Sequence, residues 1–183
     1  MALRATVYKV QLDVSDLDRN HFAQYPLTLA LHPSETEERM MVRLLAFAMH
    51  AGQDVQFGKG LSDPDEPDLW RHDLTGLIEE WIELGQPDDR NLIRACGRAR
   101  AVTVYNYGGS AATWWAAAAG KLERARNLRV RRLNVVGGDV PIAALAARTM
   151  TLNASIQEGQ IWLGDGERTV TLDCVSLQDA TAG

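Results

Sequence analysis

Alternating apolar and polar residues predict β-structure toward both ends of the chain. Residues 5–13 read ATVYKVQLD and alternate between two faces, and residues 25–31 (YPLTLAL) predict a returning strand, so the two runs form an N-terminal hairpin. Three shorter runs occur in the last third, where Gly-containing turns separate them. They predict an antiparallel meander with strands at 152–156, 160–163 and 169–177.

Between these regions the pattern switches between helical and extended periods. Ser34 and Glu37 have the spacing of a capping box, with Ser34 as N-cap, and they predict a helix over residues 35–50. Further turn and cap signals divide the middle of the chain. The other expected elements are strands at 54–57, 76–84, 101–107 and 128–136, and helices at 87–98, 111–126 and 139–148.

This order of elements predicts a mixed α/β protein with an antiparallel portion. With 183 residues and 46% hydrophobic residues, we expect a single domain over residues 1–183 with a sizeable core. The start of the chain lacks an apolar signal segment, and no run approaches the roughly 20 apolar residues that cross a bilayer. We therefore expect a cytoplasmic protein without a membrane association, in which Cys96 and Cys174 are buried, reduced thiols.

Charge argues against a broad nucleic-acid-coating surface, because the net charge is −5. The strongest local exception is the segment 124–132. It contains five arginines, which predict either contacts with phosphate groups or a solvated edge strand guarded by charge. These arginines are Arg124, Arg126, Arg129, Arg131 and Arg132.

Two acidic residues fifteen positions apart suggest a metal site. Pro67-Asp68 is followed by the strand that contains Glu83, which outlines the active site of a metal-dependent nuclease, PD followed by E-x-K. Gly85 stands where the lysine is expected. Mg²⁺ needs only one or two protein carboxylates besides water and substrate phosphate, so Asp68 and Glu83 are predicted ligands. The alternative is that acids in a Pro/Asp-rich loop are solvated turn formers.

Nearby residues are candidates for the missing lysine. Gln86 is adjacent, Arg94 lies in the next predicted helix, and Lys59 lies in a Gly-rich loop. Arginine is too basic to act as a general base, so Arg94 would stabilise charge, and activation of water would fall to the metal. Glu38, expected to point partly inward, is a further candidate metal ligand. The alternatives are that the helix arginines pair with acids or face solvent, and that Glu38 is a surface acid.

The whole chain resembles the YaeQ family of bacterial proteins. The matching segments are MALRATVYK at the start, LDRN at 17–20, HPSETEERMMVRLLAF at 32–47, DEPDLW at 65–70, WIELGQPDDR at 81–90 and RTMTLNASIQEGQIWL at 148–163. The resemblance implies a variant of the PD-(D/E)XK nuclease-like fold, with a restriction-endonuclease-like core and a mixed sheet. It assigns Asp68 to the PD acid and Glu83 to the (D/E) position, with Glu38 and Arg94 as weaker matches.

Two functions follow from these residues. One is a Mg²⁺-dependent nuclease or phosphodiesterase with a degenerate site, in which Glu83, Gln86 and Arg94 assist catalysis and Asp68, Glu83 and Glu38 hold the metal. The other is a nuclease-like binding module without catalysis, which recognises nucleic acid or a protein partner. The retained acids favour the first function and Gly85 favours the second. The oligomeric state stays open.

Overall fold

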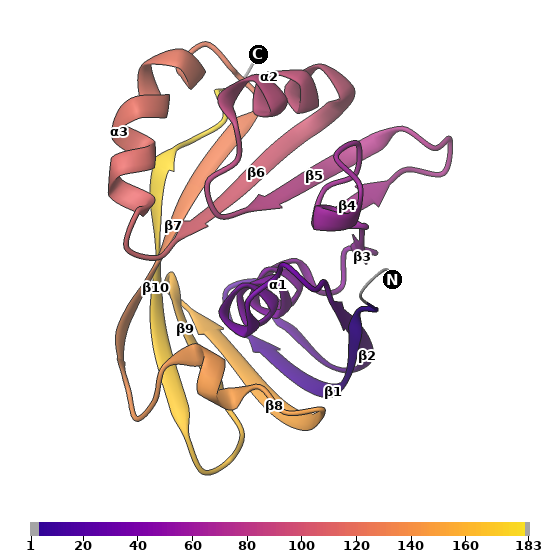
Figure 1. Ribbon diagram of the computed structural model, residues 1–183, viewed down its shortest axis with the longest axis vertical. Helices are drawn as coiled ribbons and strands as arrows, with labels where there is room; N and C mark the ends of the chain where they lie inside the picture. The colour runs from indigo at the N-terminus through magenta and orange to yellow at the C-terminus, as the bar shows by residue number, and fades with distance from the viewer. Residues whose placement is uncertain (1–3, 182–183) are drawn as a thin grey trace. The chain divides into compact units, whose positions relative to one another are not determined.

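The structure is a computed structural model that describes residues 4–181, in which ten strands, three α-helices and two 3₁₀ turns form two units (Figure 1). Unit 1 contains Met1–Gln53 and Val135–Asp173, and unit 2 contains Asp54–Asn134 and Cys174–Gly183. Two long strands, β7 (Leu128–Gly138) and β10 (Thr169–Gln178), contribute residues to both units.

The sheet of unit 1 has the strand order β2-β1-β8-β9-β10. The strands β1 (Thr6–Asp16) and β2 (His21–Leu31) pair antiparallel and confirm the predicted N-terminal hairpin. The antiparallel ladders of β8 (Thr149–Gln157), β9 (Gln160–Gly164) and β10 confirm the predicted meander. The hairpin joins the meander through a parallel ladder between β1 and β8, so both predicted β-regions belong to one unit.

The helix α1 (Glu37–His50) contacts β2 and β8 of unit 1. The predicted helix start at Ser34 is wrong, because the N-cap is Thr36, whose hydroxyl accepts a hydrogen bond from the Arg39 amide. Glu35 does not join the helix, because its carboxylate bonds Arg39 and Arg43 and also accepts from the His32 amide. The helix therefore begins two residues later than the capping box indicated.

The predicted helix over residues 139–148 is also wrong, because this region contains only the 3₁₀ turn η2 (Ile142–Leu145). The amide of Asp139 donates to the carbonyl of Thr169 at 2.9 Å, which ties the expected cap residue to strand β10 instead. Ile142 and Leu145 are buried, so the turn still contributes apolar side chains to unit 1.

The sheet of unit 2 contains a run of three parallel strands, which are β5 (Ile78–Leu84), β6 (Ala99–Tyr107) and residues 128–134 of β7. The helices α2 (Asp89–Arg98) and α3 (Ala111–Leu122) make the two crossover connections that parallel strands require. Beyond β5 the sheet continues with the antiparallel strands β4 (Leu69–His72) and β3 (Gln56–Phe57). The sequence analysis did not predict β4, which is short and contains two polar residues.

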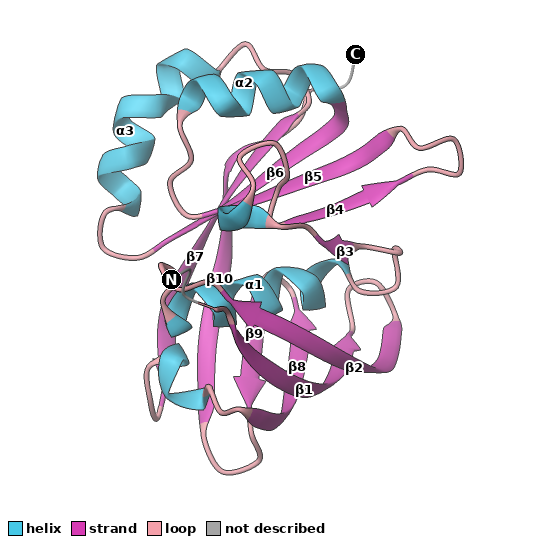
Figure 2. Ribbon diagram, turned by 45° about the vertical axis from the view of Figure 1, so that its right-hand side comes forward, coloured by secondary structure: helices cyan, strands magenta, loops and turns pink. Residues whose placement is uncertain are grey.

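Both crossover helices pack on the same face of the parallel strands (Figure 2). The buried cluster combines apolar residues from all five elements: Trp81, Leu92, Ala95, Ala99, Val102, Val104, Ala118, Leu122, Leu128 and Val130. On the opposite face of β5, Ile82 and Leu84 are also buried. The expectation that Ile82 and Leu84 pack in the core is confirmed, and Trp81 shows that the strand is buried on both faces.

Helix α3 ends four residues earlier than predicted. The side chain of Gln178 donates to the carbonyls of Leu122 and Ala125, and the Ala125 amide donates to the Leu122 carbonyl. Contacts from a segment distant in sequence thus replace the next turn of helix.

The two cysteines are free thiols, but both are only half-buried, so the prediction of full burial is wrong. Partial burial raises the pKa of Cys96 to about 11 and raises the pKa of Cys174. No helix within residues 4–181 combines the length and the hydropathy needed to span a membrane.

Candidate functional site

The candidate site lies in unit 2 at the C-terminal end of β5, where Glu83 is the penultimate residue. The strand is fixed by parallel pairing to β6 on one side and by antiparallel pairing to β4 on the other. Because a central strand buried on both faces has little freedom, the backbone at Glu83 is held firmly.

Asp68 lies immediately before β4 and is only 1% exposed. Its amide donates to the carbonyl of Ile82 at 3.1 Å, and its Oδ2 accepts a hydrogen bond from the amide of Leu84 at 3.0 Å. The Asp68 carboxylate therefore reaches the backbone on the C-terminal side of Glu83. Asp68 thus bonds the backbone of the two residues that flank Glu83 in β5, and its role as a metal ligand stays a prediction.

Glu83 is half-buried, and its Oε1 accepts a hydrogen bond from the indole N–H of Trp81 at 2.8 Å. Trp81 is 3% exposed and packs in the core of unit 2. A buried aromatic side chain thus orients the carboxylate. The sequence analysis placed Trp81 and Glu83 on one face of the strand but did not identify this contact.

Glu79, the other acid on this side of β5, has a different role. Its two carboxylate oxygens form ion pairs with Arg71 at 3.0 Å and Arg100 at 2.7 Å. Glu79 thus links strands β4, β5 and β6 near the N-terminal end of β5, whereas Glu83 lies near the C-terminal end of this strand.

Gly85 adopts a left-handed backbone conformation, with φ = +83°. A Cβ atom would have space here, since the nearest heavy atom is Tyr107 Cε1 at 3.8 Å, but an L-residue would be strained by the backbone. The Gly85 amide donates to the Tyr105 carbonyl, and the Gly85 carbonyl accepts from the Asn106 side chain at 3.3 Å. The backbone conformation gives a physical reason for glycine at the position of the expected lysine.

Gln86 holds the end of β5 against the loop that follows β6. Its Nε2 donates to the Tyr107 carbonyl at 2.9 Å, and its Oε1 accepts from the Ser110 hydroxyl at 3.1 Å. Through these contacts Gln86 positions the loop after β6. Its predicted part in catalysis stays a prediction.

Arg94 is an exposed residue of α2, whose buried positions are Leu92 and Ala95. Lys59 is also exposed, and its Nζ lies 3.7 Å from Asp63 and 3.5 Å from Glu66. The glycines that flank Lys59 contact the backbone around Asp68, because the Gly58 amide donates to the Asp68 carbonyl and the Gly60 amide to the Pro67 carbonyl.

Glu38 belongs to unit 1 and is exposed in the first turn of α1. The expectation that its side chain points inward is therefore wrong. The buried part of α1 begins two residues later and runs over residues 40–48, which leaves the first turn outside. Its assignment as a metal ligand stays a prediction.

Two polar residues of β6 were missed by the sequence analysis. Asn106 is fully buried and bonds the Gly85 carbonyl, and Tyr105 is 6% exposed. Burial raises the pKa of Tyr105, so its phenol stays protonated in the physiological range and cannot act as a general base. Only the polar Asn106 within the apolar run AVTVYNY could have pointed to this role.

The donor set at the end of β5 suits a hard divalent cation. Within residues 4–181, no group of three or more His, Cys, Asp or Glu side chains is arranged to hold a metal ion. Mg²⁺ keeps several waters and needs only one or two carboxylates, and the assignment of Asp68 and Glu83 as its ligands stays a prediction. When bound at such a site, the ion supplies charge neutralisation and an activated water.

The fold defines a mixed α+β protein, and the candidate site, with glycine at the position of the expected lysine, lies at the end of a strand that is buried on both faces. Residues 1–174 match the family model described as YaeQ protein, and the chain belongs to the YaeQ family. It is 46% identical to "Uncharacterized protein YaeQ" from Salmonella typhi over 180 residues, which cover 97% of this chain and 98% of that protein. It is also 46% identical to the protein of the same description from Escherichia coli K12 over 183 residues, with the same coverage.

Two solved structures have the same fold. The crystal structure of YaeQ protein from Xanthomonas axonopodis pv. citri has a TM-score of 0.87 and 46% sequence identity, and the match covers 95% of this chain and 98% of that chain. The crystal structure of YaeQ protein from Pseudomonas syringae has a TM-score of 0.86 and 32% identity, with 96% and 97% covered. These relatives establish the family and the fold.

Proposed function

We propose that this protein is a Mg²⁺-dependent phosphodiesterase that acts on nucleic acid through a degenerate PD-(D/E)XK site. The observation that supports the proposal is the hydrogen bond from the Leu84 amide to Asp68 Oδ2 at 3.0 Å. It holds the Asp68 carboxylate beside the backbone that follows Glu83. A cation held by two carboxylates needs both of them at ligand distance, and this contact supports such an approach of Asp68 to Glu83.

The residues have distinct roles in this proposal. Asp68 and Glu83 hold the cation, and the Trp81 indole keeps the Glu83 carboxylate oriented. Gln86 positions the loop after β6 through Tyr107 and Ser110. An amide or a guanidinium does not accept a proton near neutral pH, so neither Gln86 nor Arg94 replaces lysine as a base. We therefore expect slow hydrolysis that depends strictly on the metal.

Calorimetric titration with Mn²⁺ tests the metal site. We expect one saturable binding event for the wild type and none for Glu83→Gln. The matched control is Glu79→Gln, which removes one negative charge from the same strand but from ion pairs with arginines. Equal binding by the wild type and Glu83→Gln would rule out this acid pair as the site.

Cleavage of labelled single- and double-stranded DNA and RNA, with and without EDTA, tests the reaction. We expect product only with Mg²⁺ or Mn²⁺, and a loss of at least a hundredfold in rate for Glu83→Gln, because removing a group that stabilises the transition state has effects of this size. Product formation that persists in EDTA or in Glu83→Gln would contradict the proposal.

The positive φ of Gly85 favours a second candidate, a binding module without catalysis. Without a lysine at this position, the site lacks the side chain that usually positions and deprotonates the attacking water. This candidate predicts nucleic-acid or protein binding without cleavage in the same assays. Metal binding together with an absence of product on all four substrates would favour it over the phosphodiesterase.

A further inference from the structure

The segment from residue 121 to residue 132 contains six cationic side chains and one acid, Glu123. Three of the cations are engaged in ion pairs within unit 2. These pairs are Lys121 with Asp89 at 3.4 Å, Arg129 with Glu80 at 3.6 Å and Arg131 with Asp179 at 2.7 Å. Among the residues that the structure describes, the guanidinium groups of Arg124 and Arg126 form neither a hydrogen bond nor an ion pair. The same holds for Arg132, the sixth cation of the segment, so the charges of these three arginines remain available to an external anion.

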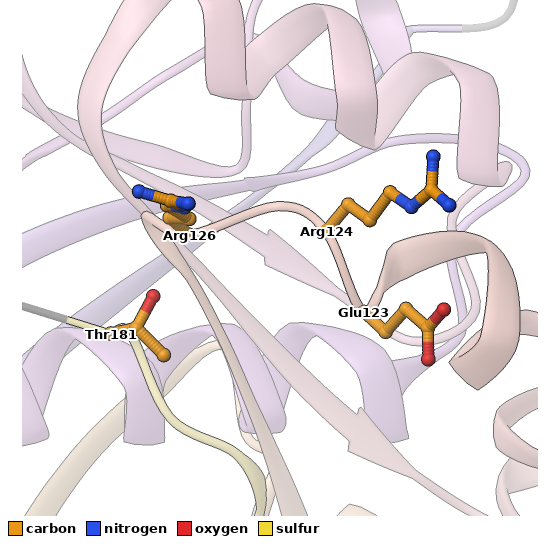
Figure 3. Close-up of a pocket in the computed structure, with 4 residues that line it drawn as sticks. All are labelled: Glu123, Arg124, Arg126 and Thr181. Carbon is orange, nitrogen blue, oxygen red and sulfur yellow. The ribbon is translucent and has the colours of Figure 1, made fainter. Parts of the chain in front are cut away.

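Arg124 and Arg126 line a surface pocket of about 640 Å³ together with Glu123 and Thr181 (Figure 3). The figure shows the two guanidinium groups pointing away from each other along the loop that follows α3. The Thr181 side chain lies on the Arg126 side of the pocket, and the Glu123 carboxylate lies on the Arg124 side of the loop. The pocket thus presents two separate cationic positions.

The pocket is built on a fixed backbone. The Thr181 amide donates to the Arg126 carbonyl at 2.9 Å. The side chain of Asn127 donates to the carbonyls of Cys96 at 2.9 Å and Ala99 at 3.0 Å, which ties the loop to the end of α2. Gln178 holds the other end of the loop through the Leu122 and Ala125 carbonyls. Because the backbone of this loop is already held in place, binding of a ligand costs little conformational entropy of the backbone.

The charge distribution favours a chain of anions over a single anion. Arginine presents a planar fork of donors that matches phosphate oxygens and keeps its charge at any physiological pH. The carboxylate of Glu123 and the negative end of the α3 dipole weaken the attraction for one isolated anion at the loop. Two guanidinium groups that diverge are suited to two neighbouring phosphates of one strand.

We propose that this pocket binds the backbone of a nucleic-acid strand, with Arg124 on one phosphate and Arg126, assisted by the Thr181 hydroxyl, on the next. The choice of a nucleic-acid strand rests on the proposed function, whereas phosphate recognition rests on the two available arginines of the pocket. The pocket would hold the strand independently of the metal, because none of its residues belongs to the acid pair.

The test is fluorescence anisotropy with a labelled 12-nucleotide oligothymidylate, in EDTA and about 50 mM salt. Loss of one phosphate contact at this salt concentration corresponds to a five- to tenfold weaker affinity, and it lowers the slope of log K against log salt by about 0.7. We expect these changes in Arg124→Gln and in Arg126→Gln. Lys9→Gln is the matched control, because it removes one exposed positive charge from unit 1, and it should change affinity less than twofold.

Three outcomes would overturn the proposal. They are an absence of oligonucleotide binding by the wild type, arginine variants that behave like Lys9→Gln, and complete displacement by low-millimolar inorganic phosphate at constant ionic strength, which would indicate a single-anion site. Circular dichroism checks that each variant is folded. EDTA and the variant Glu83→Gln separate this proposal from the metal site, because strand binding should persist in both if the pocket is responsible.

Discussion

The two units use charged side chains differently. In unit 1 the ion pairs join residues three, four or eight positions apart: Asp16 with Arg19, Glu35 with Arg39 and Arg43, and Asp165 with Arg168. Unit 2 has local pairs too, but it adds pairs over much longer distances in sequence. Lys121 and Asp89 are 32 positions apart, and Arg131 and Asp179 are 48 apart. Among the described residues, the ion pairs of unit 1 lie in local turns and at a helix start, whereas some ion pairs of unit 2 join different strands and helices.

This difference places the candidate site in the unit whose ion pairs include contacts that depend on the tertiary fold. Asp68 reaches Leu84 across 16 positions, and Gln86 reaches the Tyr107 carbonyl across 21. Both contacts need β5 to be paired with its neighbours on either side. Substitutions in unit 1 should therefore change stability, while substitutions at long-range contacts in unit 2 should also disturb the site.

Glu35→Gln should give the largest loss of stability. Glu35 is 9% exposed and binds Arg43, which is 8% exposed, through both carboxylate oxygens. Removing one partner of a buried ion pair costs roughly 3 kcal/mol. Urea unfolding measures the change, and the exposed Glu38→Gln, three positions away in the first turn of α1, should stay within about 0.5 kcal/mol of the wild type. Equal effects of the two variants would remove the distinction between buried and exposed acids in unit 1.

Asn127→Ala should cost about 2 kcal/mol, because its side chain donates two hydrogen bonds to carbonyls at the end of α2. The exposed Asn91→Ala in α2 is the matched control and should be nearly neutral. If long-range contacts assemble unit 2, Asn127→Ala should also weaken oligonucleotide binding at the adjacent loop. A variant with wild-type stability and wild-type binding would contradict this link.

Gly85→Ala should lower the free energy of unfolding by about 1 kcal/mol, because alanine is strained at a φ of +83° although its Cβ has space. Gly97→Ala, in α2 and with nothing within 4 Å of the added Cβ, should instead raise stability by up to about 1 kcal/mol. Changes of opposite sign in the melting temperatures of the two variants would confirm the backbone explanation for the missing lysine. Two substitutions of the same sign would refute it.

Asp165→Asn should have the smallest effect, and one that depends on pH. Hydrogen bonds from the Arg168 amide and side chain lower the pKa of Asp165 to about 2. A depressed pKa in the folded state means that the stabilisation is present above about pH 4 and disappears as the pH falls through about 2. The difference in melting temperature between wild type and variant should shrink over this range. A difference that is constant from pH 2 to pH 7 would contradict the ionic origin of this contact.

The parts of the structure that could be predicted from the sequence are those set by local patterns. Alternation located both β-regions, the apolar period located α1, and turn and cap signals located α2 and α3. The cap at Thr36 was missed because the contacts of the Glu35 carboxylate with His32, Arg39 and Arg43 cannot be seen in the spacing of a capping box. The helix over 139–148 was overpredicted because Asp139 bonds a strand thirty residues away. Asp68 and Glu83 could be proposed as site residues from their motif, whereas the indole contact of Glu83 and the burial of Asn106 depend on three-dimensional packing.

The central claim is that Asp68 and Glu83 bind one divalent cation together, and a crystal structure determined in Mn²⁺ with anomalous scattering tests it most directly. The account predicts a single anomalous peak within about 2.2 Å of a carboxylate oxygen of each residue, with waters completing the coordination. A map without a peak at the end of β5, or with a peak that contacts neither carboxylate, would contradict it.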